Sequence, residues 1–166
     1  MATELNHDTI KSKIVAILQA NANLYTTTGE TGELRSIEVG YPQGDVLEDK
    51  MPPYAFVTNG SGPFEIINNK GAVVTDAITA LEHVFNYDIT VVVVEKDSRA
   101  AESVLDDFQQ TILETLEEDS NLTGTGSASV DRSFPLRVDE LRVNTAQRGR
   151  GIRGRIITLR CIKTTS

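Results

Sequence analysis

The sequence has little or none of several features that particular protein classes need. Its single cysteine, Cys161, excludes an internal disulfide framework and a zinc site built on cysteine ligands. No apolar run approaches the roughly 20 residues that cross a bilayer, so no membrane association is predicted. Near the N-terminus, Glu4 and Asp8 interrupt the long apolar stretch that a secretory signal requires.

Basic residues are also fewer than acidic ones, with 16 Lys and Arg against 24 Asp and Glu and a net charge of -8. This balance excludes a protein held to nucleic acid by general positive charge. The charge is uneven, however: residues 1–131 carry 22 acids and 7 bases (net -15), and residues 132–166 carry 9 bases and 2 acids (net +7). Two interpretations remain open. The basic end neutralises the acidic body of its own subunit, or it binds the acidic body of another copy or partner.

Hydrophobic periodicity predicts two helices and several strands. Apolar spacings of three and four residues predict amphipathic helices over residues 8–22 and 98–118, the second capped by Asp97 or Ser98. A one-residue slip at Asp139–Glu140 indicates a β-bulge within a strand. Alternating apolar and polar residues predict strands over residues 37–41, 54–58, 81–94, 136–143 and 155–163.

These elements predict an α+β fold with a mainly antiparallel β-sheet and two packed α-helices, in the order α-β-β-β-α-β-β. Residues 1–166 are expected to form one domain, since this length is typical of a single domain. Residues 64–80 are ambiguous: Phe64, Ile66 and Ile67 suggest a strand, whereas Val74, Ile78 and Leu81 have helical spacing, so this stretch is left unassigned. Flexible loops rich in small residues or proline are expected near residues 26–33, 42–53, 120–130 and 147–154.

Two motifs resemble ligand-binding loops, but each has a simpler interpretation. Residues 149–154 match G-x-G-x-x-G, yet a strand pattern follows instead of the helix that dinucleotide binding needs, so a hairpin loop is expected. Asp119, Asn121 and Thr123 resemble the start of an EF-hand, but the twelfth position is Val130, so a capped glycine-rich loop is expected. No cofactor, metal or catalytic residue is predicted, and the chain is not expected to be an enzyme.

The candidate interaction residues are charged side chains in two places, around the glycine motif and on the acidic face of helix 98–118. Guanidinium groups bind phosphates or carboxylates through paired hydrogen bonds. No aromatic residue for base stacking lies between Arg148 and Arg155, so a protein contact is favoured over nucleic acid, with a solvated loop as the third alternative. The candidate protein-interaction residues are Arg148, Arg150, Arg153, Arg155, Asp106, Asp107, Glu114, Glu117 and Glu118.

Four segments carry a pattern that is shared with a known family. They are the opening helix around Ile10 to Leu18, the strand Pro52-Pro53-Tyr54-Ala55-Phe56-Val57, the strand from Tyr87 to Val94 leading into helix 98–118, and the closing strand Arg155-Ile156-Ile157-Thr158-Leu159. In this order they resemble the tail terminator (tail-completion) proteins of long-tailed viruses of bacteria and archaea. The resemblance spans most of the chain and rests on order, length and patterning, without an invariant motif.

The resemblance implies a structural virion protein with no catalytic residues and no cofactor. Tail terminators form a hexameric ring at the head-proximal end of the tail tube, end its growth and join it to the head–tail connector. The implied partners are further copies of the chain, the tail tube protein and the connector, and DNA passes through the lumen without specific binding. The implied location is the virion tail, assembled in the host cytoplasm. The alternatives are another connector or tail tube subunit, or a nucleic-acid-binding accessory protein that uses residues 148–155.

Overall fold

The structure is a computed structural model that describes residues 5–26, 33–41, 53–60, 65–68, 81–95, 97–141 and 151–165. Its elements are, in chain order, α1 (His7–Gln19), β1 (Ser36–Val39), β2 (Tyr54–Asn59), β3 (Glu65–Asn68), β4 (Leu81–Glu95), α3 (Ser98–Glu118), β5 (Arg132–Leu141) and β6 (Gly151–Thr165). The predicted α+β class and element order are confirmed. The short strand β3 lies in the unassigned stretch 64–80, where Ile66 and Ile67 belong to the suggested strand pattern.

The six strands form one sheet in the order β1-β2-β4-β6-β5, with β3 paired to the first part of β4. Every neighbouring pair is antiparallel except β1–β2, which is parallel. The two central strands, β4 and β6, are each 15 residues long and pair from Leu81 opposite Thr165 to Glu95 opposite Gly151. This long ladder forms the centre of the fold, and β1 and β5 are the outer strands.

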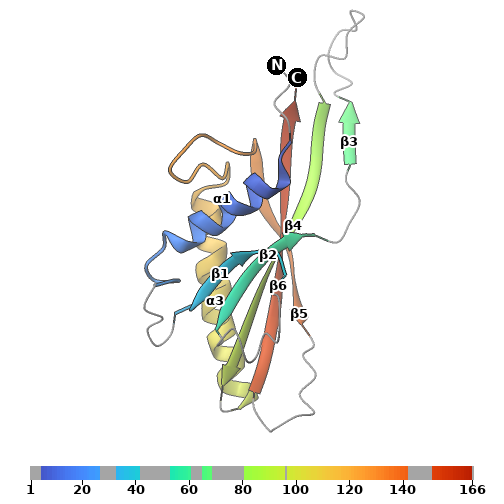
Figure 1. Ribbon diagram of the computed structural model, residues 1–166. Helices are drawn as coiled ribbons and strands as arrows, with labels where there is room; N and C mark the ends of the chain where they lie inside the picture. The colour runs from blue at the N-terminus through green and yellow to red at the C-terminus, as the bar shows by residue number, and fades with distance from the viewer. Residues whose placement is uncertain are drawn as a thin grey trace, which may run out of the picture.

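Both helices lie on the same side of the sheet, as Figure 1 shows. Side chains alternate along a strand, so odd-numbered residues of β4 such as Phe85 and Ile89 face the helices and are buried. They meet the apolar stripes of α1 and α3, in which Ile14, Leu105 and Ile112 are buried. The opposite face of the sheet holds a second, smaller cluster, which comprises Tyr54, Phe56, Val92 and Ile152.

Side-chain caps explain where the helices begin and end. The carboxylate of Asp97 accepts a hydrogen bond from the N–H of Ala100 at 2.8 Å, so α3 begins at the predicted residue and has the predicted length. Helix α1 ends at Gln19, three residues before the predicted end. The side-chain oxygen of Asn21 accepts the N–H of Asn23 at 2.9 Å, and this local bond competes with continuation of the helix.

Residues 151–154 of the glycine motif are not part of a loop, as predicted near residues 147–154, because β6 already begins at Gly151; residues 147–150 lie outside the described residues. The fifteen-residue ladder with β4 includes residues 151–154 of this motif and holds them in strand conformation. Gly154 is needed there for close packing: a Cβ atom at this position would lie 2.8 Å from Leu141 Cδ2 and 3.1 Å from the carbonyl oxygen of Val91. The absence of a side chain therefore lets three neighbouring strands approach each other.

Strand β5 also differs from its prediction. Its register shift lies between Pro135 and Arg137, whereas the sequence indicates Asp139–Glu140. Proline has no N–H for a ladder and is tolerated in an edge strand, which β5 is. Leu136 and Val138 are consequently 43% and 37% exposed, although their alternation suggests core positions. The last residues of the predicted strand lie outside the described residues.

The structure describes the remaining predicted loops to different extents. The regions near residues 26–33 and 42–53 lie largely outside the described residues. The region 120–130 is described and contains two side chains, Leu122 and Val130, that are buried in the main core. This loop is therefore anchored to the fold through apolar contacts.

Candidate functional site

Arg155 projects from β6 towards α3 and joins three elements. Its Nε donates to Glu140 Oε1 in β5 at 3.0 Å, and its Nη1 donates to Gln109 Oε1 in α3 at 2.8 Å and to the carboxylate of Asp106. The Arg155 side chain is only 9% exposed. Burial alone would lower the pKa of Arg155, but the hydrogen bonds and charges of Asp106 and Glu140 raise it. For Arg155 and Asp106, the charges are thus paired within one chain.

The four arginines around the glycine motif do not belong to one loop. Arg153 and Arg155 lie in strand β6, because the ladder with β4 extends to Gly151. Arg153 is half-buried in this strand. Arg148 and Arg150 lie outside the described residues. The predicted arginine loop is therefore wrong for its second half, and Arg148 and Arg150 remain as the candidates for contacts with another molecule.

Helix α3 has a strongly acidic outer face. It contains six acidic residues and a single basic one, Arg99. Its apolar stripe packs on the sheet, and the acids consequently face outwards. The predicted interaction residues on this helix are all exposed: Asp106, Asp107, Glu114, Glu117 and Glu118.

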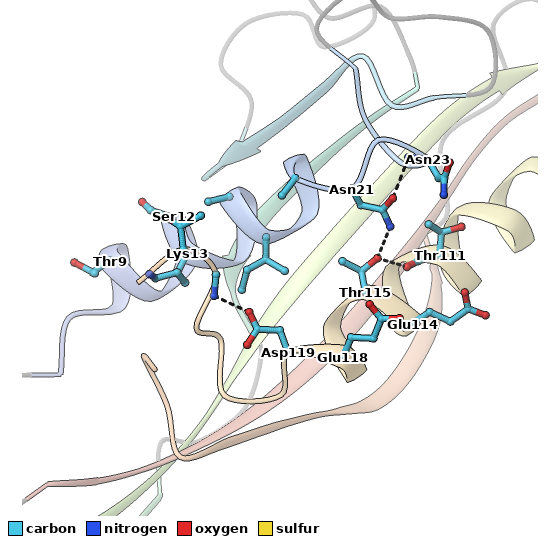
Figure 2. A pocket seen from close by; sticks show the side chains of 15 residues that line it. Thr9, Ser12, Lys13, Asn21, Asn23, Thr111, Glu114, Thr115, Glu118 and Asp119 are labelled. Atoms are coloured by element: carbon cyan, nitrogen blue, oxygen red, sulfur yellow. Dashed lines mark hydrogen bonds between the residues drawn. The ribbon is translucent and has the colours of Figure 1, made fainter. Parts of the chain in front are cut away.

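A polar groove of about 980 Å³ lies between α1 and the C-terminal half of α3 (Figure 2). Two hydrogen bonds connect its sides: Asn21 Nδ2 donates to Thr115 Oγ1 at 2.9 Å, and Lys13 Nζ donates to the carbonyl oxygen of Thr123 at 3.0 Å. Its lining is rich in hydroxyl, amide and carboxylate groups, including Thr9, Ser12, Asn23, Thr111, Glu114 and Glu118.

The groove carries a net negative charge, since Glu114, Glu118 and Asp119 line it together with one base, Lys13. The carboxylate of Asp119 is hydrogen-bonded within its own loop: it accepts the N–H groups of residues 123 and 124 at 2.8 and 2.6 Å. Burial alone would raise the pKa of Asp119, but these bonds and the nearby Lys13 lower it. The loop is thus the capped loop that the sequence predicts, and the two exposed glutamates are the charges that face outwards.

The sequence predicts the two glutamates as interaction residues but not the groove that they line. One signal was present in α1, where small residues recur at spacings of three and four at positions 9, 12, 16 and 20. Such a stripe leaves space beside a helix. What the stripe faces depends on the packing of α3, which is remote in the sequence.

Both histidines are bonded to hydroxyl groups within the scaffold. His7 Nδ1 lies 2.7 Å from the hydroxyl of Tyr87, and His83 Nε2 lies 2.9 Å from Thr165 Oγ1. Among the described residues, no group of three or more His, Cys, Asp or Glu side chains is arranged to hold a metal ion. In the same part of the chain, no helix has the length and apolar character needed to cross a membrane.

Comparison with known proteins gives a likeness of fold. The sequence matches no protein-family model and no curated protein. A chain in the solved virion of a native gene transfer agent (GTA) particle has a similar structure, with a TM-score of 0.54 and 16% sequence identity. The match covers 94% of this chain and 94% of that chain. The α+β fold described above is therefore shared, over nearly its whole length, with a component of a virion.

Proposed function

We propose that this chain is a structural protein of a virion and, within it, the tail terminator. The observation that carries the proposal is the likeness of fold to a chain of a gene transfer agent virion over 94% of both chains. The finer assignment rests on the order of α1, β2, β4 with α3, and β6, which resembles the tail terminator family. In this role the copies form a hexameric ring at the head-proximal end of the tail tube. The ring stops tube growth and contacts the tube protein and the head–tail connector.

The charge distribution supports a role in assembly. Head-to-tail contacts in a closed ring bring together two different surfaces of each copy, which must complement one another. The exposed acids of α3 form one charged surface, and the chain also has a basic end, residues 132–166, with 9 bases and 2 acids. The overall excess of acids also repels DNA, so DNA passes through the ring without specific binding.

The fold supports a tail tube subunit or another head–tail connector equally well. The similar chain belongs to a virion, and the likeness of fold does not say where in a virion this chain would lie. A nucleic-acid-binding accessory protein has less support. Of its four proposed phosphate-binding arginines, Arg155 is bonded to carboxylates of its own chain and Arg153 is half-buried in β6.

Native mass spectrometry and negative-stain electron microscopy of the purified protein test the proposal. We expect closed rings, formed either by the chain alone or on addition of tail tube protein. Long tubes from the chain alone favour a tail tube subunit. A strict monomer or dimer under every condition, tube protein included, contradicts a ring. DNA gel shifts at low salt should show no complex, and binding with a steep salt dependence would favour the accessory protein.

A further inference from the structure

Exposed apolar side chains lie at the two outer strands of the sheet. Among the described residues, the large apolar side chains that are exposed form two pairs. The β1 pair is Val39 and Tyr41, at the end of β1 and just beyond it, and the β5 pair is Leu136 and Val138. Strands β2, β4 and β6 lie between them, so the pairs are at opposite edges of one sheet (Figure 1). Four strand spacings of about 4.8 Å separate these edges by about 19 Å, so the two pairs cannot meet within one copy.

The ring of Tyr41 is held in place although its side chain is 76% exposed. The preceding residue, Gly40, has a φ of +86°, a left-handed conformation that glycine adopts at no steric cost. A Cβ atom on Gly40 would meet nothing within 4 Å, so glycine serves the backbone turn there and not the packing. The Tyr41 ring lies 5.8 Å from that of Phe56, which stacks on Tyr54 at 6.2 Å. An aromatic ring that is already positioned loses little freedom on binding and is typical of protein interfaces.

A backbone irregularity also exposes Leu136 in β5. The register of β5 with β6 shifts between Pro135 and Arg137, and Leu136 between them has no partner in β6. A β-bulge of this kind redirects the side chain of the extra residue. Val138, two residues further on, is back in register opposite Ile157 but lies in the outer strand, where its side chain is exposed. At both edges of the sheet, a local change of the backbone thus accompanies the exposed apolar pair.

We propose that the β1 pair of one copy packs against the β5 pair of a second copy. The inference rests on the self-association in the proposed function and names the surfaces that make it. The contact joins two different edges, which is the heterologous arrangement that a closed ring requires. Every copy in such a ring covers both of its apolar pairs. Pairing of like edges in a symmetric dimer would instead leave one pair of each copy exposed to water.

Side chains make this contact, because both outer strands are poor templates for a further strand. Strand β1 has four residues, and β5 contains a proline, a bulge and the charged Arg137, Asp139 and Glu140, features that hinder strand addition. Even a fully buried aromatic side chain covers only about 150–250 Å². One contact between two such pairs is therefore smaller than the roughly 1,200–2,000 Å² of a stable complex. A separate partner at one edge would gain this small area once, whereas a second copy gains it at both edges when a ring closes.

Opposite charges placed on the two pairs test the contact. One variant is Val39→Lys/Tyr41→Lys, and the other is Leu136→Glu/Val138→Glu. In either variant alone, every contact sets two charges against an apolar pair, and rings should be lost in native mass spectrometry under conditions in which the wild type forms them. In a 1:1 mixture, a ring of alternating variants has lysines opposite glutamates at every second contact and wild-type pairs at the others, so rings should return. Rings that persist in either variant, or a mixture that stays unassembled, would overturn the proposal.

A matched control comes from the loop after α3. Thr125 and Ser127 are exposed, are two residues apart and belong to neither outer strand. Lysines or glutamates at both positions make the same changes of net charge and should assemble like the wild type; loss of rings in these controls would assign the effect to net charge and overturn the proposal. Tyr41→Ala is a milder change and should raise the concentration for half-assembly about tenfold. Circular dichroism and cooperative melting establish that each variant is folded.

Cysteine cross-linking tests the contact without rings. Chains with Tyr41→Cys and chains with Val138→Cys, mixed at high concentration under mild oxidation, should give a cross-linked dimer that neither chain gives alone. The native Cys161 should stay unreactive, because it is fully buried and burial raises its pKa to about 12. Cross-linking of either chain with itself, or none in the mixture, overturns the inference.

The two ideas fail separately. Cross-links between unlike edges without wild-type rings contradict only the terminator. Wild-type rings whose edges give no such cross-link contradict only the edge contact.

Discussion

Arg155 forms ion pairs with Asp106 and Glu140. Removing the two acids and removing the arginine should lower the stability of the protein by different amounts. The Arg155 side chain is 9% exposed, whereas those of Asp106 and Glu140 are 62% and 57% exposed. Removing both acids leaves a cation in a poorly hydrated position, with Gln109 as its remaining described acceptor. Removing Arg155 instead leaves two carboxylates that water can hydrate. The first change should therefore destabilise the protein more than the second.

The structure sets the magnitudes. Breaking a fully buried ion pair on one side costs about 3–5 kcal/mol, and the exposure of both acids reduces this to about 2 kcal/mol for Asp106→Ala/Glu140→Ala. Arg155→Met keeps most of the apolar stem and removes the buried charge, so we expect a loss of about 1 kcal/mol. The triple variant should resemble Arg155→Met, because no buried cation is left to desolvate.

Thermal and urea unfolding followed by circular dichroism measure these differences, with all variants at one protein concentration because assembly shifts apparent stability. Each kcal/mol should lower Tm by about 2–4 °C in a chain of this length. Asp139→Ala, which breaks an exposed ion pair with Arg137, is the control and should cost less than about 1 kcal/mol. The reasoning is refuted if Arg155→Met costs more than loss of both acids, or if the triple variant shows the sum of the two effects.

Three further predictions concern stability. Leu105→Ala and Phe108→Ala, at side chains 1% and 4% exposed, should each cost about 2–5 kcal/mol in urea unfolding, whereas the exposed Ser103→Ala should change little. Burial lowers the pKa of His7 below its ordinary 6.5; the unfolded chain then binds a proton that the folded chain does not, so stability should fall as the pH drops below about 6.5. His7→Gln should abolish this part of the pH dependence, and an unchanged fall would assign it to other groups. Asp119→Ala removes the acceptor of two backbone N–H groups and should cost about 1–2 kcal/mol at neutral pH. Because the folded pKa of Asp119 is lowered from 3.8, its contribution is present above that pH and is lost as the pH falls through the folded value, so the variant should show a weaker acid dependence there.

Local patterns predicted much of the fold. The bounds of α3 followed from an apolar stripe and a capping aspartate, both of which act within a few residues. The alternation of β4 predicted a long strand for the same reason. The strand conformation of residues 151–154 could not be predicted, because it comes from pairing with residues 92–95, which are far away in the sequence. The short strand β3 likewise depends on its pairing with β4.

The candidate site divides in the same way. The exposure of Glu114 and Glu118 follows from the position of the apolar stripe on their own helix. The groove beside them depends on how closely α1 approaches α3, which involves residues about a hundred positions apart. The internal pairing of Arg155 depends on the register of β6 with β5 and on the packing of α3. The sequence could therefore suggest charged surfaces but not which of their charges are already paired.

The sequence by itself determined the two helices, most of the strands and the division of charge into -15 and +7 parts. Net charge is a sum over residues and is independent of conformation. Interaction between charges depends on their separation and on the surrounding water, which only folding sets. The tertiary structure decided that Arg155 is bonded to Asp106 and Glu140 inside one chain. It also decided which acids share the groove with Lys13, because that groove exists only where α1 packs beside α3.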